Sequence, residues 1–115
     1  AFVARFYAHD ADAAARLGAE TEARMLEMPP ATIAAQARAI GARRAMVPLL
    51  SGLAMPVEVV VGAEDIVCPP KLHAPLAQAL PGAALTQIPG TGHIATLEAP
   101  EAVNARLARL AERVA

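Results

Sequence analysis

Hydrophobic residues along the chain change their spacing near residue 57. Before that point, apolar side chains recur at helical intervals in two stretches, residues 1–28 and residues 32–46. Two consecutive prolines separate the stretches, and proline cannot continue a helix. We therefore predict two helices, with Gly18 as a break in the first and Thr32 as the N-cap of the second.

The spacing from residue 57 onward is typical of strands. The run from Val57 to Val61 is β-branched except for Glu58, as in a parallel strand that is covered on both faces. A shorter strand is predicted from Ala84 to Ile88. The pattern therefore places two strands in the second half of the chain.

A helix is expected after each strand. The first should run from Pro70 to Leu80, with its regular part beginning near His73 because Pro75 fits only in a first turn. The second should run from Pro100 to about Val114, with Glu98 and Glu101 near the positive end of its dipole. We expect its apolar stripe to face the core; the stripe consists of Val103, Leu107, Leu110 and Val114.

Strand, helix, strand and helix in this order predict an α/β fold with a crossover connection between parallel strands. Two parallel strands are not stable alone, because their open edges need further sheet. We therefore expect the two strands to be part of a larger doubly wound sheet whose other strands are not in this chain.

Composition limits the core and the partners that this chain can have. Hydrophobic residues make up 56% of the 115 residues, but aromatic residues only 3%. Alanine supplies much of the apolar share and buries little area, so the core should be modest. The net charge is −1 and the basic residues do not cluster, apart from Arg43 and Arg44, so we expect no binding to nucleic acid or to a membrane.

Cys68 is the only cysteine, so no internal disulfide can form and a reducing compartment, the cytoplasm, is expected. The histidines and acidic residues show no spacing typical of a metal site. We expect neither a metal nor another cofactor.

Two residues with catalytic side chains follow the two strands. Asp65 lies just after the first strand, and His93 lies in the glycine-rich loop after the second. Because the carboxyl ends of parallel strands meet at one edge of a sheet, the two side chains should lie together. The carboxylate would then accept the Nδ1 proton of the imidazole and leave Nε2 as a proton acceptor.

The residues around this pair closely resemble the C-terminal part of the α/β-hydrolase superfamily, over residues from about 50 to 115. The resemblance rests on the segments PVEVVVGAEDIVCPP (56–70), LPGA (80–83), GTGHI (90–94) and LEAPE (97–101). It is greatest for the branch of 3-oxoadipate enol-lactonases, esterases and cofactor-free haloperoxidases. The resemblance implies that Asp65 is the triad acid and His93 the general base of a hydrolase that cleaves an ester or lactone through an acyl-enzyme.

The nucleophile of that family is absent from this chain. The expected G-x-S-x-G elbow does not occur, and Ser51, the only serine, lies in a connection before the first strand. We therefore expect the nucleophile and the oxyanion hole on an N-terminal part of the enzyme, and this chain alone to be inactive. Residues 1–30 resemble the end of a helical cap, and residues 31–115 the C-terminal part of the core.

Several other side chains have both a structural and a functional interpretation. Cys68 is interpreted as a buried structural cysteine, although relatives with a cysteine nucleophile exist. His9 and His73 are expected to face solvent. Three apolar residues next to the catalytic pair would either pack or line the substrate pocket: Ile66, Val67 and Ile94.

Two other functions remain open at this point. The enzyme could use an aspartate nucleophile, as haloalkane dehalogenases do, because only the missing elbow would decide. Alternatively, the chain could be a non-catalytic binding or assembly module that pairs through the open edge of its sheet.

Overall fold

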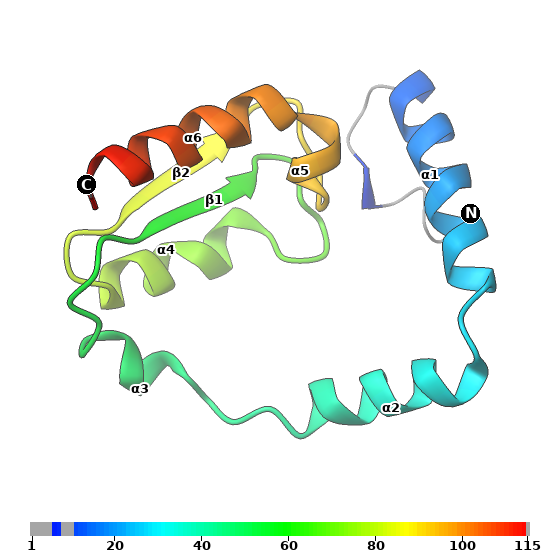
Figure 1. Cartoon of the computed structure of the whole chain (residues 1–115), viewed down its shortest axis with the longest axis horizontal. Coiled ribbons are helices and arrows are strands. Elements are labelled where there is room, and N and C mark those ends of the chain that lie inside the picture. Colours follow the sequence, from blue (N-terminus) through cyan, green and yellow to red (C-terminus); the bar gives the residue numbers. More distant parts are fainter. Residues whose placement is uncertain (1–5, 8–10, 115) are drawn as a thin grey trace.

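The computed structural model describes residues 6–7 and 11–114. In this part of the chain, β1 (Glu58–Gly62) and β2 (Ala84–Ile88) pair in parallel, with Glu58 opposite Ala84 and Gly62 opposite Ile88. The two strands lie between two helices and point toward the same end of the molecule (Figure 1). The predicted strands are therefore present, and β2 has the predicted bounds.

Helices α4 (Pro70–Ala79) and α6 (Pro100–Glu112) cover this small sheet (Figure 1). Helix α4 contacts both strands, and α6 contacts β1. The prediction that the regular part of α4 begins near His73 was wrong, since the helix starts at Pro70 and contains Pro75 in its interior. Proline at the first position favours this early start, at the cost of one intrahelical hydrogen bond at Pro75.

The first half of the chain forms helices α1 (Ala11–Leu26), α2 (Pro30–Gly41) and α3 (Val47–Leu50). Helix α1 continues through Gly18, so the predicted break was wrong; a glycine inside a helix costs only about 1 kcal/mol. The N-cap of α2 is Pro29 and not Thr32, because Pro30 takes the favourable first position. The short helix α3 was not predicted.

The core of the described residues lies in two places. Around the sheet, the buried hydrophobic side chains are Val59, Val61, Leu80 and Ile88. A second small cluster consists of Tyr7 and Leu17, with Phe6, Ala14 and Ile94 packed against it. This modest core agrees with the expectation from the alanine-rich composition.

Two of the four residues of the predicted core stripe are exposed in this chain, whereas Val103 and Leu110 are partly buried. Leu107 is 57% exposed and Val114 is 63% exposed, so their assignment to the core was wrong for this chain. The reason is the width of the sheet, which has two strands in the described part of the chain and so offers α6 little surface to cover. Helix α2 has no buried residue either. Within the described ranges, no helix is long and apolar enough to span a membrane.

Candidate active site

Asp65 is held in place by the turn that follows β1. Its amide donates a hydrogen bond to the carbonyl of Gly62 (3.2 Å), which closes the turn. Its Oδ1 accepts the amide protons of Val67 and Cys68, both at 2.8 Å. An aspartate forms this local turn readily because its short side chain reaches amides two and three residues ahead. Oδ1 is therefore occupied, and Oδ2 remains for another partner.

His93 lies in the loop after β2. Gly90 has a φ of +64°, a conformation that favours glycine and turns the chain sharply. Thr91 is only 2% exposed and donates a hydrogen bond from Oγ1 to the carbonyl of Pro89 (3.1 Å). The Thr91 carbonyl accepts the amide proton of Glu64 (2.9 Å), which ties this loop to the turn that carries Asp65.

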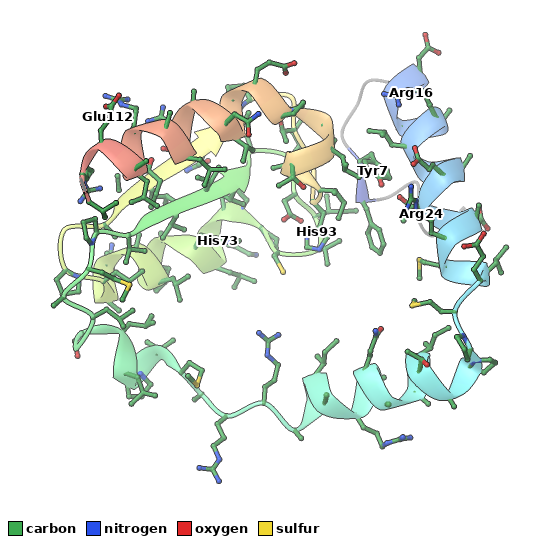
Figure 2. All side chains as sticks on the ribbon, viewed as in Figure 1. Tyr7, Arg16, Arg24, His73, His93 and Glu112 are labelled. Atoms are coloured by element: carbon green, nitrogen blue, oxygen red, sulfur yellow. The ribbon has the colours of Figure 1, made fainter. Side chains whose placement is uncertain are left out.

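The structure brings Asp65 and His93 together. The Nδ1–H of His93 donates to Oδ2 of Asp65 at 2.9 Å, because an ionised carboxylate can only accept. This bond fixes the imidazole tautomer and leaves Nε2 as the proton acceptor. The side chain of His93 is 30% exposed, whereas that of Asp65 is 4% exposed. In Figure 2, His93 lies at the end of the sheet that faces Tyr7.

The surroundings of Asp65 stabilise its charged form. Burial by itself would raise the pKa of Asp65. The hydrogen bonds from His93 and from the amides of Cys68 and Val67 outweigh this effect, together with the attraction of His93, and the pKa is lowered. Asp65 is therefore a carboxylate at neutral pH, as the acid of a triad must be.

Three consecutive amides around His93 have hydrogen-bond acceptors. Glu98, in the one-turn helix α5 (Ala95–Glu98), accepts from Gly92 (Oε2, 2.9 Å) and from Ile94 (Oε1, 3.3 Å). The amide of His93 itself donates to the carbonyl of Phe6 at 2.6 Å. The ring centroids of Phe6 and His93 lie 5.7 Å apart, with the ring planes at 52°.

Sequence reasoning missed both of these neighbours of His93. The expected place of Glu98 near the dipole of the last helix does not predict that its carboxylate bonds to the histidine loop. A single helical turn is too short to leave a periodic pattern of hydrophobic residues, so the sequence did not predict α5. The close approach of Phe6 depends on the path of the chain before α1, which no local pattern predicts.

The predicted substrate-contacting residues have different environments. Ile66 is 60% exposed and Val67 is 43% exposed, and both directly follow Asp65 in the chain. Ile94, in contrast, is partly buried and packs against the cluster of Tyr7 and Leu17. Ile94 therefore has a packing role at least.

The remaining candidate residues have environments that differ from those of Asp65 and His93. Cys68 is partly exposed, not buried as predicted, because it lies in the turn after β1, where the preceding residues Ile66 and Val67 are exposed. His73 is also partly buried and not fully solvent-facing, since its Nδ1 lies 3.2 Å from the carbonyl of Pro69. Ser51 is exposed at the end of α3, and His9 lies outside the described residues.

A second cluster of charged side chains lies at the other end of the sheet. A cavity of about 390 Å³ there is lined by Glu58, Ala84, Arg106, Arg109, Glu112 and Arg113. Glu58 faces Arg106 at 3.7 Å and Arg113 at 4.0 Å, so the acid offsets the arginines. Strand ends of this kind do not carry the catalytic groups of doubly wound sheets. Among the described residues, no group of histidine, cysteine or acidic side chains could hold a metal ion.

The chain is similar to several known proteins over part of its length. No protein-family model matches it. It is 46% identical over 57 residues to BpoC of Mycobacterium tuberculosis, which is named as a non-heme bromoperoxidase; the match covers 50% of this chain and 22% of that protein. The chain therefore spans about a fifth of the length of this relative.

Solved structures agree with this similarity. The thermophilic esterase of Thermogutta terrifontis matches 64% of this chain at 30% identity and a TM-score of 0.60, with 27% of its own length. The BpoC structure from M. tuberculosis matches 60% at 39% identity and a TM-score of 0.57, with 26% of its length. Rv0554 from M. tuberculosis matches 90% at 25% identity and a TM-score of 0.53, with 52% of its length. The chain has the fold of the C-terminal part of an α/β hydrolase.

Proposed function

We propose that this chain supplies the acid and the general base of a serine hydrolase that cleaves an ester or a lactone through an acyl-enzyme. The hydrogen bond of 2.9 Å between Nδ1 of His93 and Oδ2 of Asp65 carries this proposal. Further support comes from the similarity to a structurally known esterase. Ile66 and Val67, exposed beside Asp65, would contact the substrate, together with Ile94.

Each half of the proposed reaction moves one proton through Nε2 of His93. As the serine oxygen attacks the carbonyl carbon, Nε2 takes the hydroxyl proton and the carbonyl becomes an oxyanion. When this intermediate collapses, the alcohol leaves with the proton from Nε2, and the acyl group stays on the serine. Water then attacks the acyl group while Nε2 takes one of its protons; collapse of this second intermediate releases the acid, and Nε2 passes the proton to the serine oxygen. Asp65 orients the imidazole and stabilises its charged form throughout.

The nucleophile and the oxyanion hole would come from an N-terminal part of the enzyme, outside these 115 residues. Residues 1–30 would end a helical cap, and residues 31–115 would complete the core. Because acid and base without a nucleophile lack the covalent step, the chain alone would be inactive. A cytoplasmic location fits the single cysteine, Cys68.

A fluorophosphonate probe tests the type of nucleophile in the complete enzyme. Such a probe phosphonylates a serine that a histidine activates, and peptide mass spectrometry locates the label. We expect the label on a serine outside this chain, with labelling at least about 100-fold slower after His93→Ala. A label on Ser51 would contradict the proposal.

Labelling together with a measurement of halide release separates the two alternative functions. Halide release from a haloalkane without any fluorophosphonate label would indicate an aspartate nucleophile. The absence of both labelling and halide release would indicate a non-catalytic assembly module. Either result would overturn the serine mechanism.

A further inference from the structure

We propose that Glu98 is a positioning residue for His93, because its carboxylate holds the amides on both sides of the histidine. This inference rests on the proposed function. Glu98 accepts hydrogen bonds from the backbone of the histidine loop, and its expected effect passes through that backbone.

The contacts of Glu98 restrain the loop at two points. Oε2 accepts from the amide of Gly92 at 2.9 Å, and Oε1 accepts from the amide of Ile94 at 3.3 Å. These residues immediately precede and follow His93. A carboxylate has two oxygens with lone pairs, so one side chain can hold two amides at once. Hydrogen bonds to a charged acceptor are also stronger than those to a neutral one.

The fold keeps Glu98 at the correct distance. Helix α5 is one turn long, and the amides of Leu97 and Glu98 both donate to the carbonyl of Ile94, at 2.9 and 3.1 Å. This helical turn brings the carboxylate of Glu98 back to the amides of Gly92 and Ile94, which come earlier in the chain. Glu98 is partly buried, so its bonds are less weakened by solvent than those of an exposed side chain.

The restraint matters because the position of Nε2 depends on the path of the loop backbone as well as on the side chain of His93. The imidazole is bonded to Asp65 through Nδ1, and the loop backbone is held by the amide of Glu64 and the carbonyl of Phe6 in addition to Glu98. Glycine at position 92 offers no side chain to hold the loop, and its backbone is intrinsically permissive. Without Glu98, the histidine would sample positions in which Nε2 is misplaced, and a shift of about 1 Å can cost about 100-fold in rate.

The test compares variants of the complete enzyme in pre-steady-state hydrolysis of p-nitrophenyl acetate, with substrate in excess over enzyme. For Glu98→Ala, we expect the acylation rate per active site to fall about 10- to 100-fold, with the burst amplitude and KM nearly unchanged. Glu98→Gln keeps one acceptor oxygen but sets its NH₂ group against the other amide, so its rate should lie between those of Glu98→Ala and the parent. Glu101→Ala, a nearby exposed acid on α6, is the matched control and should match the parent.

A second readout does not depend on turnover. The Nδ1–H proton of His93 should give an NMR signal that exchanges slowly with solvent while it is bonded to Asp65. Glu98→Ala should accelerate this exchange, whereas Glu101→Ala should not. A merely structural role would instead lower the burst amplitude and leave the rate per site and the NMR signal of the folded fraction unchanged.

The outcomes distinguish this inference from the proposed function. If His93→Ala abolishes acylation but Glu98→Ala acylates at the parent rate per site, the inference about Glu98 is wrong and the proposed function stands. If His93→Ala also acylates at the parent rate, the proposed function is wrong. A loss confined to burst amplitude in both Glu98 variants likewise overturns the positioning role.

Discussion

Gly62 and Gly92 pack backbone against backbone. A β-carbon on Gly62 would lie 2.1 Å from the carbonyl oxygen of Gly92 and 2.3 Å from that of Thr91. Gly62 is the last residue of β1, and Gly92 directly precedes His93. The absence of a side chain at Gly62 therefore lets the histidine loop approach the strand that leads to Asp65.

Replacing Gly62 by alanine should displace the histidine loop. The clashing atoms belong to the backbone and cannot rotate away, so we expect a loss of about 1–3 kcal/mol in the free energy of unfolding, together with lower activity. Urea unfolding measures the first effect. Gly41→Ala is the control, because nothing lies within 4 Å of its β-carbon. Equal unfolding midpoints for both variants would contradict the close packing.

Replacing Asp65 by asparagine should lower the catalytic rate more than the stability of the fold. The oxygen of the new side chain can still accept from the amides of Val67 and Cys68, but its NH₂ group would face Nδ1 of His93. Nδ1 would then have to accept, and the proton would move to Nε2. We expect kcat to fall about 10³- to 10⁴-fold with little change in KM. Steady-state hydrolysis of an aryl ester by the complete enzyme checks this, and a fall below about 10-fold would exclude Asp65 as the orienting acid.

Stability should depend on pH through Asp65. Its pKa is lowered in the folded protein from the ordinary value of 3.8, so the unfolded state binds the proton first as the pH falls. The stabilisation from this carboxylate is therefore complete above 3.8 and is lost as the pH falls through the lower folded value. Urea unfolding from about pH 6 to about pH 2 should show a smaller loss for Asp65→Asn than for the parent. Parallel curves would contradict the lowered pKa.

Much of this arrangement could be predicted from sequence because it depends on local patterns. The bounds of β2 follow from the turn residues Pro81–Gly82 and Pro89–Gly90 on either side of it. The meeting of Asp65 and His93 follows from topology, since two consecutive parallel strands bring their carboxyl ends together.

The contributions that depend on tertiary packing were not predictable. The two bonds from Glu98 require a one-turn helix whose direction no periodicity indicates. The exposure of Leu107 depends on how many strands α6 can cover, which is a property of the whole sheet. The need for glycine at position 62 arises from Thr91 and Gly92, which lie 29 and 30 residues further along the chain and outside the strand pattern.

The central claim is that His93, oriented by Asp65, is the general base of an acyl transfer. Release of p-nitrophenol from p-nitrophenyl acetate, measured per active site in the complete enzyme, tests it most directly. His93→Ala should lower this rate by about 10³-fold or more, while His73→Ala, on α4, should leave it unchanged. A rate for His93→Ala within about 10-fold of the parent would contradict the claim.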